Sequence, residues 1–517
     1  MGTKSDYIAK INKIPTISFN KEQKEIAKKI IESTDEKDLD AVYGLITQRV
    51  KTGFVFDEAP EVNHNCVALV KEDKKLNITG DGLEPVEHKL IIGENYDALK
   101  NLCATYIDKS GKGLIDVIYI DPPYNTEATK QEGNDYKEEI EATKFIYRDK
   151  FTRDGWLNMM NERLKLAKRL LSDKGVIFIS IDDTEQAYLK VLCDEVFGEN
   201  NFIATYIKQS KIGGGSDSKF VVKEHEYCLV YAKNINLTDE MFIPHDKEYL
   251  KRYKEKDDKG RYFWDTFARP GLKNPIYYDI KAPDGTIIRN GWIHSKDRFE
   301  QEYACGDVRI IKKNSSEWSV QFKQYLNENG KKPRSMTMDF GGSIEGKNDI
   351  GLLFDDEKIF SYPKSVKYMS SLLKTITKKD IIVLDFFAGS GTTGQAVMEL
   401  NEEDGGKRQF ILVTNNENNI GTDITRERLY RVIKGKGSKG EQLSWQYSKE
   451  KPYLSSNNVT VFKIDHTALT LKDLEKAEKI RDIAKAEFKK LNPNCSLNND
   501  FDVYNELAAL NPQKGEK

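Results

Sequence analysis

The run Val117-Ile118-Tyr119-Ile120 is followed directly by Asp121-Pro122-Pro123-Tyr124. Its four apolar residues predict a buried strand, and the residues after them place a carboxylate and two prolines at the carboxyl edge of that strand. Ligands of open α/β sheets bind at this edge. Two consecutive prolines fix φ and remove two backbone donors, so the turn offers hydrogen-bond acceptors to a planar base, and the tyrosine ring can stack on it. The stretch therefore predicts an α/β fold with a pocket for an exocyclic amino group.

A second motif lies about 260 residues downstream. The apolar run 381–384 predicts another buried strand and leads into Asp385-Phe386-Phe387-Ala388-Gly389-Ser390-Gly391-Thr392-Thr393-Gly394. The three glycines match the G-x-G-x-x-G pattern of a strand–turn–helix nucleotide site, in which missing side chains let a ligand approach the backbone. Alone, this loop fits a nicotinamide enzyme equally well. Such an enzyme has no use for the Asp121–Tyr124 turn, which favours a different chemistry.

An acidic residue follows this loop at a suitable spacing. The apolar run 410–413 leads to Glu417, which lies 23 residues beyond Gly394. This is close to the spacing at which an acidic side chain binds ribose hydroxyls. We therefore expect Glu417 to contact the ribose of a nucleoside cofactor.

Together, D-P-P-Y and F-x-G-x-G-T-T resemble the S-adenosylmethionine-dependent amino-methyltransferases of DNA, and the order of the two motifs resembles their permuted β class. The chain also resembles the modification subunit of type III restriction–modification systems. Four stretches carry this likeness: Ile118–Thr126 (IYIDPPYNT), Gly175–Asp183 (GVIFISIDD), Glu224–Lys233 (EHEYCLVYAK) and Leu384–Thr393 (LDFFAGSGTT). The resemblance covers roughly residues 85–435 and implies a doubly wound Rossmann-like methyltransferase sheet with permuted motif order.

The expected domain organisation has five parts. They are a mostly helical N-terminal extension (1–85), the first part of the catalytic domain with the DPPY turn (86–240), an inserted target-recognition domain (241–355), the second part of the catalytic domain with the cofactor loop (356–440) and a helical C-terminal extension (441–517). In the last of these, an apolar stripe from Leu471 to Leu491 predicts a docking helix, either on its own domain or on another subunit. The long polar stretch 125–155 predicts a lid.

The expected reaction is methyl transfer to adenine N6. Asp121 and the Pro122 carbonyl accept the two N6 hydrogens, Pro123 stiffens the turn, and Tyr124 stacks on a base that has left the duplex. Cytosine N4 uses the same geometry, but the resembled family more often has serine in place of Asp121 for that reaction, which favours adenine.

Several residues are expected to hold S-adenosylmethionine. Lys364 belongs to Tyr362-Pro363-Lys364, which resembles the motif that packs beside the methionine end of the cofactor. Glu94 stands where the family usually has the aspartate of G-D-N, so a contact with the cofactor adenine and an ordinary surface position both stay open. The full expected set is Glu94, Asp121, Lys364, Asp385, Phe387, Gly389, Gly391, Thr392 and Glu417.

The composition agrees with a soluble cytoplasmic protein. The chain has 517 residues, of which 38% are hydrophobic and 32% charged, and no apolar stretch approaches the roughly 18 residues of a membrane span. Its six cysteines include no C-x-x-C pair, and its six histidines show no ligand spacing, so we expect no metal site.

Double-stranded DNA is the expected partner, although the net charge is only −2. Affinity must then come from local patches. The stretch 247–273 holds nine basic and five acidic residues with interleaved aromatics, which fits either a DNA surface or a solvated face. Six basic residues are candidate base readers: Arg269, Lys273, Arg289, Arg298, Arg309 and Arg334.

The chain contains no G-x-x-x-x-G-K-[ST] loop, so an ATP-dependent restriction activity would need another polypeptide. The resemblance implies such a separate restriction subunit and a homodimer. A stand-alone methyltransferase is the alternative.

Overall fold

The computed structural model describes residues 3–13, 21–47, 62–125, 153–210, 219–269, 271–313, 317–337, 340–468, 474–495 and 507–510. Most of the stretch expected to form a lid, 126–152, lies outside these residues. The chain divides into two compact units. The first, here called the sheet unit, comprises Met1–Asp239, Ser335–Ser370 and Lys379–Lys517, and the second, the inserted unit, comprises Glu240–Arg334 and Ser371–Lys378.

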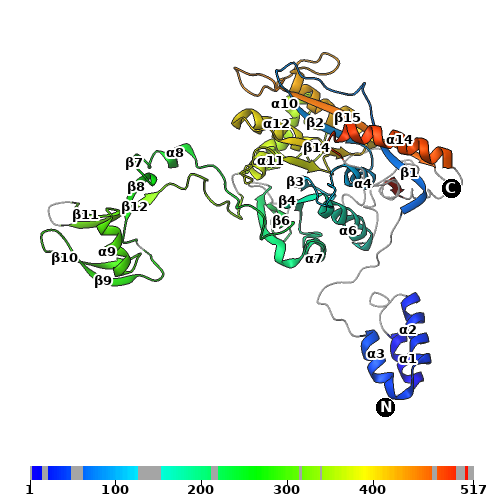
Figure 1. The fold of residues 1–517 in the computed structure, drawn as a ribbon, viewed down its shortest axis with the longest axis horizontal. Coiled ribbons are helices and arrows are strands. Elements are labelled where there is room, and N and C mark those ends of the chain that lie inside the picture. The colour runs from blue at the N-terminus through cyan, green and yellow to red at the C-terminus, as the bar shows by residue number, and fades with distance from the viewer. Residues whose placement is uncertain are drawn as a thin grey trace. The chain divides into compact units, whose positions relative to one another are not determined.

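The sheet unit is built on a sheet whose described strands follow the order β16-β1-β15-β2-β14-β13-β3-β4-β6-β5 (Figure 1). The strands are β1 (Val62–Glu72), β2 (Val86–Ile92), β3 (Ile115–Ile120), β4 (Leu171–Ile181), β5 (Phe202–Gln209), β6 (His225–Ala232), β13 (Ile382–Asp385), β14 (Gln409–Thr414), β15 (Asn457–Ala468) and β16 (Ala508–Leu510). From β15 to β4 all neighbours are parallel, whereas β6 and β1 run antiparallel to the strands beside them.

The centre of this sheet is a topological switch point. β3 and β13 are neighbours, with Val117 opposite Val383 and Ile118 opposite Leu384. The chain leaves β3 through α6 (Arg153–Leu170) towards β4, and it leaves β13 through α12 (Thr392–Asp404) towards β14 on the other side. Connections that diverge in this way open a crevice at the carboxyl ends of the two strands. The doubly wound fold is confirmed.

Helices cover both faces of the sheet, which explains why its central strands are continuous apolar runs. On one side α4 (Asn95–Thr105), α6 and α7 (Gln186–Phe197) pack together, and on the other α12 and α10 (Ser343–Phe354) pack with α13 (Glu427–Lys434) (Figure 1). The remaining helical segments of this part of the chain are η3 (Glu199–Asn201), α11 (Val366–Leu373), η4 (Glu417–Asn419) and η5 (Ile420–Arg426).

The segments expected to be helical extensions also contribute strands. β1 lies within 1–85 and β15 within 441–517, and β15 is inserted between β1 and β2. The reason is that Val459, Val461 and Phe462 are buried in the sheet. In the C-terminal helix α14 (Leu474–Leu491), Phe488 and Leu491 belong to the main core, so its apolar stripe packs on its own unit.

The N-terminal helices form a small cluster of their own. They are α1 (Lys4–Lys13), α2 (Lys21–Ser33), η1 (Glu36–Asp38) and α3 (Leu39–Thr47). Tyr7, Ile11, Ala27, Ile31 and Leu39 are buried between them. Among the residues that the structure describes, no helix combines the length and the apolar character that a membrane span requires.

The inserted unit is built mainly of short strands. Its elements are α8 (Lys247–Leu250), β7 (Glu255–Asp257), β8 (Gly260–Thr266), β9 (Ile276–Lys281), β10 (Ile287–Trp292), α9 (Lys296–Ala304), β11 (Val308–Lys312) and β12 (Trp318–Tyr325). One antiparallel sheet has the order β11-β12-β8-β7, and β9 pairs with β10 as a hairpin. The long segment of this unit ends at Arg334 rather than near residue 355, because α10 packs in the sheet unit, and Ser371–Lys378 adds a second, short segment.

Candidate active site

The two motifs line one cavity of about 470 Å³ at the switch point. Its wall contains all four residues of the Asp121–Tyr124 turn, which follow β3, together with Asp385, Phe387, Gly389 and Thr392 from the loop after β13. Lys364 closes the same wall. The sequence expectation that two distant segments meet at one sheet edge is confirmed. The volume is typical of a small-molecule site.

The glycine loop is shaped for close approach to the backbone. Gly389 and Gly391 have φ values of +49° and +80°, in the left-handed region that favours glycine. A Cβ on Gly389 would lie 3.2 Å from the ring of Phe360, and one on Gly391 would lie 3.1 Å from a methyl group of Thr425. Side chains at either position would therefore crowd the turn.

Asp385 is a buried carboxylate at the base of this loop. Its Oδ1 accepts a hydrogen bond from the Phe387 amide at 3.0 Å, and its Oδ2 accepts one from the Thr393 hydroxyl. Burial raises the pKa of Asp385 to about 7; the two hydrogen bonds oppose this shift and the negative charge of Asp121 adds to it. The Asp385 carboxyl can therefore bind a cation, because a nearby positive charge would favour the ionised form of the carboxyl.

An ion cluster holds the DPPY turn in place. The Lys364 ammonium lies 3.1 Å from Oδ1 of Asp121 and 3.0 Å from Oε2 of Glu226. It also donates to the Tyr124 hydroxyl at 2.7 Å, and that hydroxyl donates to Oδ1 of Asp121 at 2.8 Å. Both contacts reach the same carboxylate oxygen. Among the described residues, no side chain or backbone group is hydrogen-bonded to Oδ2 of Asp121, so that oxygen is available to a ligand.

Glu226 is the centre of the cluster on its buried side. Its carboxylate lies 3.5 Å from the ammonium of Lys208, a nearly fully buried lysine that also stacks over the Tyr368 ring. Burial pushes the pKa of Glu226 upwards, but Lys364 and Lys208 outweigh it and lower the pKa to about 2. For Lys364 the directions are reversed: burial lowers the pKa of this lysine, but Asp121 and Glu226 outweigh burial and raise the pKa well above its ordinary value. Lys364 is therefore a permanent cation beside Asp121.

A second network ties Lys364 to the glycine loop. The fully buried Arg428 donates to the Thr392 hydroxyl at 2.8 Å, and that hydroxyl donates to the Lys364 carbonyl at 3.1 Å. Thr392, expected as a cofactor contact, lines the cavity and also links the two segments that build it.

Three of the predicted cofactor residues do not line the cavity. Glu94 caps the amino end of α4, accepting from the Tyr96 and Asp97 amides, and pairs with Arg163. It is neither an exposed surface acid nor part of the cavity wall. Glu417 falls in η4, three residues beyond β14, whereas Thr414 and Asn415 at the end of that strand reach the wall. Gly391 shapes the turn without lining the cavity itself.

Sequence reasoning did not identify Glu226, which pairs with Lys364 beside the DPPY turn, or Lys208, which pairs with Glu226. Glu226 and Lys208 carry charges inside otherwise apolar strands, β6 and β5, and this conflict with burial is the signal that identifies them. Phe360 also lines the cavity, but nothing in the sequence around it would have identified it. In the part of the chain that the structure describes, no group of three or more His, Cys, Asp or Glu side chains is placed to hold a metal ion.

Comparison with known proteins agrees with this geometry. A family model described as DNA methylase, for N6 and N4 methyltransferases, matches residues 115–434. A second model, described as an uncharacterised conserved protein (UCP028340), matches residues 4–110.

Individual relatives extend the likeness beyond the family model. The Mod subunit of the type III restriction–modification enzyme StyLTI from Salmonella typhimurium is 35% identical over 72% of this chain and 57% of that protein. The EcoPI Mod subunit of Escherichia phage P1 is 30% identical over 71% and 65%. The type II methyltransferase M.KpnI of Klebsiella pneumoniae is 30% identical over 68% and 86%.

The chain thus spans 57% and 65% of the lengths of the two Mod subunits, but most of the length of M.KpnI. The DNA methylase model covers more than half of the chain, from β3 to the end of α13, and includes both walls of the cavity. On this evidence the chain belongs to the N6/N4 DNA methylase family.

Proposed function

We propose that this protein is a site-specific DNA methyltransferase that moves a methyl group from S-adenosylmethionine to N6 of an adenine extruded from the duplex. The observation that carries the proposal is the shared cavity, in which the Asp121–Tyr124 turn faces the glycine loop. The names of the relatives, two Mod subunits and a type II methyltransferase, support it.

The residues of the cavity fit S-adenosylmethionine. The backbone of Gly389 allows close approach, Phe387 offers an apolar surface, and the Asp385 carboxylate suits the ammonium of the methionine part. Thr414 and Asn415 take the place expected for Glu417 at the end of β14. When bound, the cofactor supplies a methyl group on a positively charged sulfur, which makes that methyl an electrophile.

Asp121 prepares the target amino group. Adenine N6 is a poor nucleophile because its lone pair is delocalised into the ring, and the base must first leave the duplex at a cost of a few kcal/mol. With Oδ1 held by Lys364 and Tyr124, the free Oδ2 of Asp121 accepts one N6 hydrogen and the Pro122 carbonyl accepts the other. These contacts localise the lone pair on N6. The carboxylate then stabilises the positive charge that develops there.

Lys364 and Tyr124 act on Asp121 and not on the reacting atoms. The hydroxyl of Tyr124 is fixed by two hydrogen bonds, which sets the orientation of its ring for stacking on the base. Since Lys364 also pairs with Glu226, the positive charge of Lys364 is partly balanced. Asp121 can therefore still accept a hydrogen bond from the amino group at N6.

The proposal has an alternative for the target base and another for the assembly. Cytosine N4 presents the same amino group, and aspartate at position 121 favours adenine. The names of the two Mod relatives favour a modification subunit, and we propose that it works in the cytoplasm as a homodimer with a separate ATP-dependent restriction subunit. M.KpnI, named as a type II enzyme, favours a stand-alone methyltransferase.

The direct test uses purified protein, duplex DNA and S-adenosylmethionine with an isotopically labelled methyl group. DNA digested to nucleosides should contain labelled N6-methyladenine, measured by mass spectrometry. Sequencing that detects methylated bases in cells with and without the protein gives the recognition sequence. Labelled N4-methylcytosine would reassign the base, and the absence of any labelled nucleoside would contradict the proposal.

Cofactor affinity should depend on pH through Asp385. Its pKa of about 7 means that the carboxylate becomes protonated as the pH falls below 7. Because the ionised form binds the ammonium, the Kd for S-adenosylmethionine should rise by up to about tenfold per pH unit below that point. Calorimetric titrations at pH 6, 7 and 8 measure this. In Asp385→Asn the dependence should disappear, which separates it from titration of the cofactor itself.

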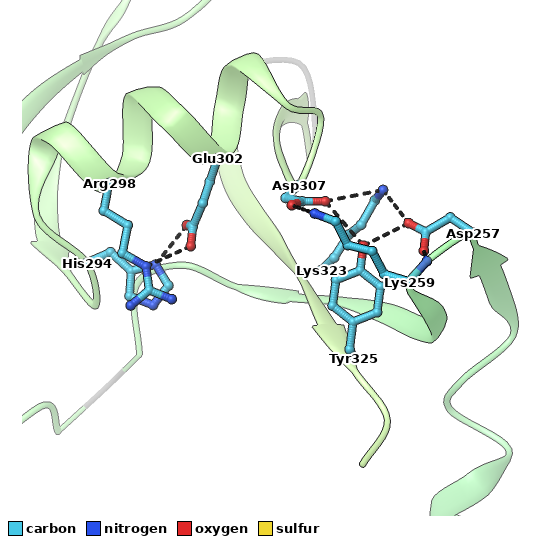
Figure 2. Close-up of polar contacts among 8 residues, drawn as sticks. All are labelled: Asp257, Lys259, His294, Arg298, Glu302, Asp307, Lys323 and Tyr325. Carbon is cyan, nitrogen blue, oxygen red and sulfur yellow. Dashed lines mark hydrogen bonds and ion pairs between the residues drawn. The ribbon is translucent and has the colours of Figure 1, made fainter. Parts of the chain in front are cut away.

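The inserted unit is the proposed target-recognition domain, and much of its charge is neutralised internally. Figure 2 shows the Lys323 ammonium between the carboxylates of Asp257 and Asp307, the Lys259 ammonium on Asp307, and Arg298 on Glu302. Of the six candidate base readers, Arg269, Arg289 and Arg298 likewise have acidic partners, and Arg309 bonds to Gln321.

The lysines that stay available in the stretch 247–273 are Lys247, Lys254, Lys256 and Lys273. They are exposed, and within the described residues no acidic group pairs with them. Changing Lys247, Lys254 and Lys256 to Gln should reduce the slope of log K against log salt by about 0.9 per lost phosphate contact. Filter binding over a range of salt concentrations measures the slope. Lys259→Gln is the matched control, since Asp307 already neutralises that lysine, and an equal loss of slope in both proteins would refute this surface.

A further inference from the structure

Three consecutive apolar side chains stand in solvent next to the cavity. Phe220, Val221 and Val222 are 86%, 77% and 38% exposed, and Lys219 and Lys223 flank them. Scattered exposed apolar residues are ordinary, but a contiguous exposed cluster marks a site of interaction. The DPPY turn, the glycine loop and the ion cluster do not use this segment.

The carboxyl end of the segment is fixed to the cavity rim. Lys223 lines the cavity, and its ammonium lies 3.2 Å from Oδ2 of Asp183. The Tyr227 hydroxyl donates to the same Asp183 at 2.8 Å, and His225 lies 2.9 Å from that hydroxyl. The first residues of β6 and the end of β4 therefore hold Lys223 in position.

This anchoring limits how far the aromatic ring can lie from the site. Phe220 lies three positions before Lys223, and so the Cα atoms of the two are at most about 11 Å apart. Bases in a stack repeat at about 3.4 Å. The Phe220 Cα thus lies within about three base steps of Lys223, which lines the cavity.

We propose that Phe220 is a wedge that enters the base stack of the duplex where the target adenine has left it. The inference rests on the proposed function, because it requires an extruded base. Apolar side chains inserted between base steps are a known way to unstack DNA, and an aromatic ring can stack on the bases that the extrusion exposes. Val221 and Val222 add apolar contact beside it.

The charges around the wedge favour a nucleic acid as the occupant. Lys219 lies over the Phe220 ring, 5.2 Å from its centroid, and Lys223 follows at the other end of the cluster. The three apolar side chains suit contact with stacked bases, and the two flanking ammonium groups suit contact with the phosphates of the DNA backbone. A second copy of this chain is the competing occupant, and the oligomeric state tests it.

The experiment compares wild type, Phe220→Ala and Leu83→Ala. Leu83 is 94% exposed and is absent from the cavity wall, which makes it a matched control for the loss of an exposed apolar side chain. Each protein methylates two duplexes that carry the recognition site: a fully paired one, and one with an abasic nucleotide opposite the target adenine. S-adenosylmethionine affinity and light scattering are measured in parallel.

Phe220→Ala should methylate the paired duplex about 10- to 100-fold more slowly than wild type, the range expected for a lost base–aromatic stack. Most of this loss should be recovered on the abasic duplex, since an unpaired adenine leaves the stack at lower cost. Leu83→Ala should match wild type on both duplexes, and cofactor affinity should be unchanged throughout.

Three results would overturn the wedge while leaving the proposed function intact. They are an unimpaired Phe220→Ala protein, an equal loss on both duplexes, and a change of oligomeric state in this variant, which would make the triplet a subunit contact. A wild-type protein that methylates neither duplex would instead remove the proposed function, and the wedge with it.

Discussion

Replacing Asp121 with alanine is expected to lower the rate of methyl transfer by about 10²- to 10³-fold, the usual effect of removing one preorganised group that faces developing charge. The affinity for S-adenosylmethionine should change little, because the hydrogen bonds that hold Asp385 and the glycine loop come from Phe387 and Thr393 and not from Asp121. Single-turnover methylation and calorimetric cofactor binding measure the two effects separately.

The folded state of this variant should be preserved, since Lys364 keeps its second partner, Glu226, at 3.0 Å. Asp121→Asn is the informative companion. It retains an oxygen that can accept one N6 hydrogen but lacks the negative charge, so its residual activity reports how much of the effect is electrostatic. Wild-type rates in the alanine variant would remove Asp121 from the role assigned to it.

Replacing Lys364 with methionine is expected to impair both folding and catalysis. The change leaves the buried carboxylate of Glu226 with Lys208 alone, at 3.5 Å, and it removes the cation that holds Asp121. Breaking a buried ion pair from one side typically costs about 3–5 kcal/mol. Chemical denaturation should show a loss of about that size in the free energy of unfolding, and methyl transfer should fall with it.

A double variant distinguishes this explanation from simple loss of packing. Lys364→Met combined with Glu226→Gln removes the uncompensated charge, so part of the lost stability should return. Activity should not return, because Asp121 and Tyr124 still lack their common partner. A double variant no more stable than Lys364→Met alone would show that Glu226 and Lys364 are not energetically coupled.

The sequence identified the elements whose signals are local. The DPPY turn, the glycine loop and the strands that lead into them are runs of apolar residues followed directly by a polar motif, and each appears where it was expected. The family likeness predicted a doubly wound sheet, but the pairing of β3 with β13 at its centre became known only from the structure.

The features that escaped prediction depend on contacts between distant residues. β15 buries Val459, Val461 and Phe462 because it is inserted between β1 and β2, two strands from the other end of the chain. Glu226 and Lys364 are 138 residues apart and become partners only when β6 and the segment before α11 meet. Glu417 was misplaced because β14 ends at Thr414, earlier than the spacing rule assumes.

The position of β15 has a consequence for how the chain is made. β1 and β2 are complete by residue 92, yet the strand that joins them begins only at Asn457. At ribosomal speeds of about 5–20 residues per second, both edges wait roughly 20–70 seconds for their shared neighbour. Unpaired strand edges are templates for aggregation. The unpaired edges of β1 and β2 therefore have to avoid other strands until β15 has been synthesised, and we expect soluble yield to depend on translation rate and on chaperones.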